Sequence, residues 1–99
     1  MFVGTCSFDL LLGDVRSLKG KRSLVRPLIA DLRRRFDVAV AETAHLDLHR
    51  RAGIGVAVVA ADPARCIEVL DACERFVADR PEFELLAVHR RLADDEEDA

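Results

Sequence analysis

Residues 17–42 constrain the fold most, because the spacing of their apolar side chains changes from a helical period to a strand period. The first part carries an apolar stripe at helical spacing, which predicts an amphipathic helix. The stripe consists of Leu18, Val25, Leu28, Ile29, Leu32 and Phe36. From Asp37 to Ala44 larger residues alternate with small ones, as in a strand. A helix that passes directly into a strand is therefore central to the fold.

Pro27 lies inside the predicted helix. A proline there removes one backbone hydrogen bond and clashes with the carbonyl group four residues earlier, at a cost of about 3 kcal/mol. We therefore expect the regular helix to begin near Ser23 or to kink, with a looser first turn over residues 18–22.

The rest of the chain supplies three more strands and one more helix. Residues 2–12 alternate with a period of two, which predicts a strand whose phenylalanine side faces the core. Residues 53–61 are almost continuously apolar, as in a central strand covered on both faces. Asp62 and Pro63 are a typical N-cap and first residue of a helix, which we expect to end at residues 79–81. Residues 83–92 are predicted to form the last strand.

This order, β-α-β-β-α-β, is that of the split βαβ, ferredoxin-like α+β fold. It predicts a four-stranded antiparallel sheet, in the order 4-1-3-2, with both helices on one face. We expect a single domain over residues 1–92, followed by a disordered acidic tail over residues 93–99.

The face of the sheet without helices is expected to be small, smooth and apolar along its middle. Such patches usually mark contacts with partners, so we expect a homo-oligomer, with a symmetric dimer packed through this face as the simplest form. The candidate interface residues are Val3, Thr5, Ala39, Ala41, Ala57 and Val59.

The net charge of −3 hides a strong segregation of charge. Residues 16–51 hold ten basic and four acidic residues, whereas residues 52–99 hold five basic and twelve acidic ones. A dipolar surface of this kind can steer an anionic partner. The candidate phosphate-binding residues are Lys19, Lys21, Arg22, Arg26, Arg50 and Arg51, with Arg33, Arg34 and Arg35 as an extension.

Two observations limit the nucleic-acid interpretation. Basic helix faces are often only solvated, so charge by itself is unspecific. The chain has no Trp or Tyr, and its five Phe residues fall on predicted core positions, so a sheet that stacks single-stranded bases on aromatic rings is disfavoured. We expect any RNA contact to involve phosphates and shape, and nothing in the sequence indicates DNA binding.

No catalytic constellation is recognisable. Glu42, His45, Asp47 and His49 are metal-ligand types within eight residues, but such spacing in a loop is weak evidence and a solvent-exposed polar hairpin loop is the favoured interpretation, so no metal and no cofactor are expected. Residues 12–16 have too little glycine to cradle a phosphate, and no nucleophile is paired with a base. The sequence therefore favours a protein that is not an enzyme.

Cysteine usage and hydropathy indicate a cytoplasmic protein. Cys6, Cys66 and Cys73 are odd in number and lie within apolar patterns, which is typical of reduced core thiols. The longest apolar run, residues 54–61, is far shorter than the roughly 20 residues that span a membrane, and no signal peptide is recognisable. We therefore expect no membrane association.

Three segments resemble the YlxP-like family, a small bacterial domain of unknown function with a ferredoxin-like fold. They are SLKGKR at residues 17–22, RFDVAVAE at residues 35–42 and DLHRRAGIGVA at residues 47–57, and the resemblance extends to Leu92. The chain departs from the family at Asp37, commonly Asn, at Ala39, commonly Ser, and at residues 49–50, commonly Trp-Gln.

Family genes tend to lie among those for translation initiation and ribosome maturation, so the resemblance implies a partner in that machinery. Our hypothesis is a non-enzymatic domain that binds structured RNA or the ribosome through its basic helix and hairpin loop. The alternative is a homo-oligomeric protein-interaction module with no nucleic-acid role.

Overall fold

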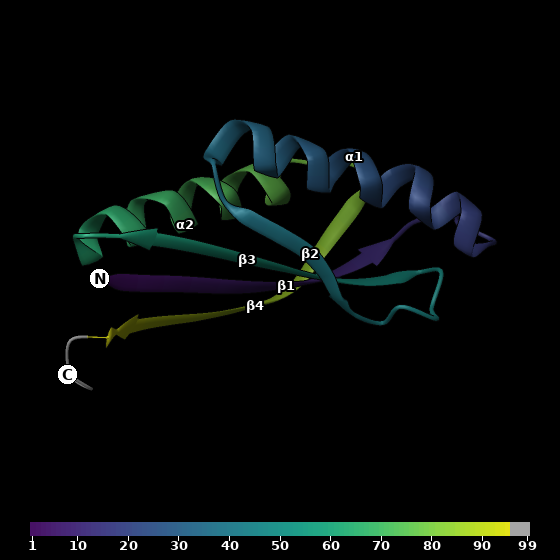
Figure 1. Ribbon diagram of the computed structural model, residues 1–99. Helices are drawn as coiled ribbons and strands as arrows, with labels where there is room; N and C mark the ends of the chain where they lie inside the picture. The colour runs from purple at the N-terminus through teal and green to yellow at the C-terminus, as the bar shows by residue number, and fades with distance from the viewer. Residues whose placement is uncertain (96–99) are drawn as a thin grey trace.

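The computed structural model describes residues 1–95, which form one sheet of four antiparallel strands with two helices on one face (Figure 1). In chain order the elements are β1 (Phe2–Leu12), α1 (Leu18–Phe36), β2 (Ala39–Ala44), β3 (Arg51–Ala60), α2 (Pro63–Ala78) and β4 (Phe83–Asp94). The strands lie in the order β2-β3-β1-β4, so the predicted ferredoxin-like α+β fold is confirmed. Neither helix of residues 1–95 is long and apolar enough to cross a membrane.

The core lies between the helices and the sheet. Every second residue of β1 from Gly4 to Leu12 is buried, as the alternation predicted. Phe8, which is only 1% exposed, has the largest of the fully buried side chains. The apolar stripe of α1 and the Cys- and Val-rich face of α2 pack against the buried face of the sheet and complete the core.

Helix α1 begins at Leu18, so the prediction of a loose first turn was wrong. Ser17 is the N-cap, and its Oγ accepts a hydrogen bond from the backbone N of Gly20 at 3.0 Å. Pro27 lies on the exposed side of a continuous helix, where it removes one backbone hydrogen bond. The cap and the buried residues of the first turns keep this end helical despite that loss.

The boundaries of three strands also differ from the prediction, and β3 spans Arg51–Ala60 where residues 53–61 were expected. β2 begins two residues late, because Asp37 ends α1 in a left-handed conformation with φ of 53° and donates its N–H to the carbonyl of Arg33. β4 continues to Asp94, paired with β1 so that Phe2 lies opposite Asp94. Residues 93 and 94 are therefore strand, not tail, and residues 96–99 lie outside the described part of the chain.

A β-bulge in β2 explains one glycine of β3. The register shifts between Glu42 and Ala44, so that Ala44 lies opposite Gly53. A Cβ atom at Gly53 would be 2.6 Å from the Cβ of Ala44 and 3.2 Å from its backbone. Only glycine fits at this close approach.

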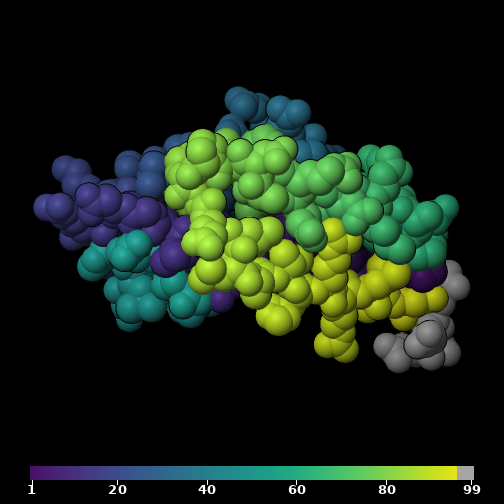
Figure 2. Space-filling view, turned by 180° about the vertical axis from the view of Figure 1, so that it is seen from behind, coloured from purple at the N-terminus to yellow at the C-terminus, as the bar shows by residue number. Residues whose placement is uncertain are grey.

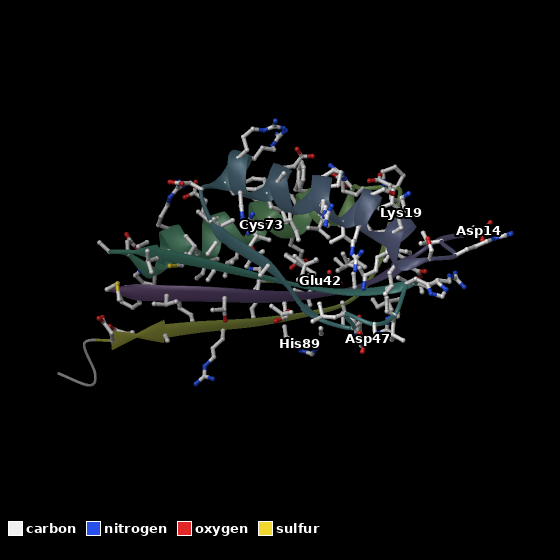
Figure 3. The ribbon with its side chains drawn as sticks, turned by 45° about the vertical axis from the view of Figure 1, so that its right-hand side comes forward. Asp14, Lys19, Glu42, Asp47, Cys73 and His89 are labelled. Carbon is white, nitrogen blue, oxygen red and sulfur yellow. The ribbon has the colours of Figure 1, made fainter. Side chains whose placement is uncertain are left out.

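Strand β3 is central but covered on one face only, contrary to the prediction. Ala52, Ile54, Val56 and Val58 are buried beneath the helices, whereas Val59 is 63% exposed on the opposite face. Figure 3 shows His89 of β4 on this side of the sheet, away from the helices. The apolar sequence of β3 is therefore only partly explained by the fold of one chain.

Candidate phosphate-binding surface

Lys21 is buried and holds the β2–β3 loop, residues 45–50. It lies on the core-facing side of α1 with 2% exposure. Its Nζ donates to the carbonyl oxygens of His45 and Leu48, each at 2.7 Å, and lies 2.7 Å from Oε2 of Glu42. Lys21 thus makes two hydrogen bonds and one ion pair, and Oε2 of Glu42 is buried with no hydrogen-bond partner of its own in residues 1–95. Lys21 therefore serves the fold, and its predicted role as a phosphate contact is wrong.

The loop that Lys21 holds is compact and lies against the start of α1. His45 adopts a left-handed conformation with φ of 60°, and its carbonyl also accepts from the N–H of Leu48 at 3.1 Å. Figure 2 shows the loop in teal beside the chain that leads into α1. In Figure 3, Glu42 lies between α1 and the sheet, whereas Asp47 lies at the outer side of the loop. A basic helix and the hairpin loop thus share one end of the molecule.

Lys19, Arg22 and Arg26 form a row on the outer face of α1. Their spacing of three and four residues places them on one side of the helix, and all three are exposed. Figure 3 shows Lys19 on the side of α1 that points away from the sheet. With Ser23 and Pro27 they line a shallow hollow of about 420 Å³. Within residues 1–95 no ion pair involves any of the three cations.

The remaining arginines of α1 are engaged elsewhere. Nη2 of Arg33 donates to the carbonyl of Val40 at 2.6 Å, and Nη2 of Arg34 pairs with Asp31 at 2.9 Å. The guanidinium of Arg35 lies 5.2 Å from the centre of the Phe76 ring, a cation–π distance. The proposed extension of the basic surface over these three residues is therefore weaker than their charge suggests.

Arg51 and Arg50 do not belong to the row on α1, since both lie in or beside the β2–β3 loop. Nη2 of Arg51 donates to both carboxylate oxygens of Asp9, at 2.8 and 2.6 Å, and this pair lies on the uncovered face of the sheet. Arg51 holds the pKa of Asp9 below its ordinary value, with a smaller contribution from the nearby His45. Arg50 is exposed, and its Nε donates to the carbonyl of Gly13 at 2.9 Å. Its remaining guanidinium nitrogens point to no acceptor within residues 1–95.

The structure separates the side chains of the candidate metal cluster. Glu42 pairs with Lys21, while Nε2 of His45 lies 3.5 Å from the Asp9 carboxylate. Among the described residues no group of three or more His, Cys, Asp or Glu side chains is arranged to hold a metal ion. Glu42 at the end of β2 and the loop of residues 45–50 thus have structural contacts.

The three cysteines are free thiols in the core. Burial raises the pKa of Cys73 to about 11 and also raises the pKa of Cys6. Both thiols therefore stay protonated at neutral pH, and neither has the lowered pKa of a nucleophilic cysteine.

The uncovered face of the sheet holds all six candidate interface residues. The register places Thr5 opposite Ala57, Val3 opposite Val59 and Ala39 opposite Ala57, with their side chains on the same side. A shallow hollow of about 340 Å³ lies over this region. Sequence reasoning missed the contribution of β4, whose Arg91 lies opposite Thr5 on this face. β4 therefore adds charge to this face, with Arg91 beside Thr5 and Glu84 opposite Leu11.

Comparison with known proteins agrees with this architecture. Residues 3–90 match the family model described as "Protein of unknown function (DUF503)". The chain belongs to this family. It is also 24% identical, over 82 residues, to the "Uncharacterized protein YlxP" of Bacillus subtilis (strain 168), an alignment that covers 83% of this chain and 89% of that protein. The resemblance to YlxP-like proteins is thus confirmed, and DUF503 carries no assigned activity.

Proposed function

We propose that this domain is a non-enzymatic cytoplasmic protein that binds the phosphates of structured RNA, such as ribosomal RNA, through Lys19, Arg22 and Arg26. The observation that carries the proposal is the exposed row of three cations without an acidic partner in residues 1–95. Like charges three and four residues apart destabilise a helix by about 0.2–0.5 kcal/mol per pair. A bound polyanion removes this repulsion.

The scarcity of exposed aromatic rings indicates how this surface would bind RNA. All five phenylalanines are buried or half-buried, and Trp and Tyr are absent from the sequence. Bases of a single strand therefore find no exposed ring of Phe, Tyr or Trp on which to stack within the described chain. Phosphate contacts on a folded or double-stranded RNA suit this surface better, and Arg50, at the same end of the molecule, can add to them.

The test is a titration of a labelled RNA duplex of about 20 base pairs at 50 and 200 mM salt. Three phosphate contacts, at about −0.9 each, predict a slope of log K against log[salt] of about −2.7, which is roughly a 40-fold loss of affinity over this range. The double variant Arg22→Ala, Arg26→Ala should make the slope shallower, at about −1, because one phosphate contact remains.

The matched control removes two other exposed charges. Arg34 and Arg65 pair with Asp31 and Glu68 on the surfaces of α1 and α2. Their replacement by Ala changes the net charge equally and should leave the slope near that of the original protein. Absence of binding at 50 mM salt, or equal losses in both variants, would refute the proposal.

A second candidate function is self-association through the uncovered face of the sheet. It is favoured by the apolar sequence of β3, which is typical of a strand covered on both faces, and by the 63% exposure of Val59. Ala41 lines the hollow on this face, so Ala41→Arg should convert a dimer into a monomer in sedimentation equilibrium. A monomeric original protein at high concentration would exclude this candidate.

A further inference from the structure

The hollow on α1 contains an unusual backbone acceptor. Pro27 has no N–H, so the carbonyl of Ser23, four residues earlier, lacks its regular helical donor. Both residues are exposed, and both line the hollow between the cations. The carbonyl thus lacks its regular backbone donor, and the three charged side chains that line the hollow offer donors only.

The side chain of Ser23 adds a second acceptor. Its hydroxyl donates to the carbonyl of Gly20 at 2.6 Å, which uses the only proton of that hydroxyl. The remaining lone pairs of Oγ can then only accept. The hollow therefore combines three cationic donors, Lys19, Arg22 and Arg26, with two neutral acceptors.

This combination matches a ligand that carries an anionic group beside a hydroxyl donor. A phosphate can accept from the cations, but it offers no proton to the acceptors of Ser23. In RNA each phosphodiester lies beside a ribose 2′-hydroxyl, which can donate, and DNA has no such group. We propose that the hollow on α1 recognises a ribose 2′-hydroxyl next to a bound phosphate, and so prefers RNA to a nucleic acid without that hydroxyl. This inference rests on the proposed function.

The experiment compares two duplexes of one sequence, unmodified RNA and RNA with fluorine in place of each 2′-hydroxyl. Both adopt A-form geometry, but the fluorinated duplex has no 2′ donor. One neutral hydrogen bond predicts that the original protein binds unmodified RNA roughly three- to tenfold more tightly. Pro27→Ala supplies the missing N–H to the Ser23 carbonyl and keeps every charge. It should reduce this preference to less than about twofold and leave the affinity for the fluorinated duplex unchanged.

Pro27→Ala replaces a residue that disfavours helix with the best helix former, so a raised melting temperature will verify that the variant is folded. Ser23→Ala removes only the Oγ acceptor and should lower the preference by a smaller factor. Equal affinity of the original protein for the two duplexes overturns this inference and leaves the proposed function standing. A preference that persists in Pro27→Ala overturns the role of the Ser23 carbonyl. Failure to bind either duplex refutes the proposed function itself.

Discussion

Lys21→Met tests whether the buried ammonium group, and not only the apolar stem, holds the β2–β3 loop. Methionine retains the length of the stem but removes the ion pair with Glu42 and the two hydrogen bonds to the carbonyls of His45 and Leu48. Removal of one partner of a buried ion pair costs about 3–5 kcal/mol. Because the side chain of Glu42 is 22% exposed as a whole, although its Oε2 is buried, we expect the lower end, about 3 kcal/mol.

Urea unfolding followed by circular dichroism measures this loss. Lys19→Met is the matched control, since it removes the same charge from the same helix at an exposed position and should change the free energy of unfolding by less than about 0.5 kcal/mol. Hydrogen exchange of the amides of residues 46–50 should accelerate in Lys21→Met and not in Lys19→Met. A loss below about 1 kcal/mol in Lys21→Met, or similar losses in both variants, would refute the reasoning.

The double variant Lys21→Met, Glu42→Leu separates the ion pair from the loop contacts. Replacement of both charges by apolar groups is often nearly neutral for a buried pair. The two loop carbonyls still lose their donor, so about 1–2 kcal/mol of the destabilisation should remain. A double variant as unstable as Lys21→Met would show that Glu42 is not coupled to Lys21.

Three further predictions concern the sheet and the core. Gly53→Ala should lower the free energy of unfolding by about 1–3 kcal/mol, because its Cβ would lie 2.6 Å from the neighbouring strand, whereas Gly13→Ala, with nothing within 4 Å, should be nearly neutral in the same urea assay. Arg51 lowers the pKa of Asp9, so the stability from this pair is present above the ordinary carboxyl pKa and is lost as pH falls through the lowered one. Asp9→Asn should flatten the melting temperature against pH below about pH 4, and an unchanged profile would contradict this. With a pKa of about 11 and full burial, Cys73 should react with a thiol reagent roughly 100-fold more slowly in the folded than in the unfolded protein, and fast reaction of the native state would disprove it.

Sequence patterns predicted the elements because their signals are local. The alternation of residues 2–12 and the Asp62-Pro63 pair each lie within the element that they define, and both agree with the structure. The Arg51–Asp9 pair joins residues 42 positions apart and depends on the exact register of β1 and β3. No local pattern contains that register, so the charge of Arg51 and its place in the hairpin loop suggested a phosphate contact.

The burial of Lys21, by contrast, could have been predicted from the helical spacing of its neighbours. Leu18, Val25, Leu28 and Leu32 lie on one helical stripe with a gap of seven residues between the first two, and Lys21 fills that gap at an interval of three and four residues. Lys19 lies two residues earlier and therefore points about 200° away around the helix. Residue type outweighed helical position in our prediction, although position decides which cation is buried.

The placement of β1 between β3 and β4 has a consequence for synthesis on the ribosome. Phe2 pairs with both Ala60 and Asp94, so the first strand translated must await the last before the sheet is complete. Contacts of such long sequence separation make folding slower than in a helical bundle of equal size. Nascent chains that end before residue 83 expose the β1 edge that β4 covers. This unpaired edge is the first place where chaperones would bind or where intermolecular strand pairing would begin.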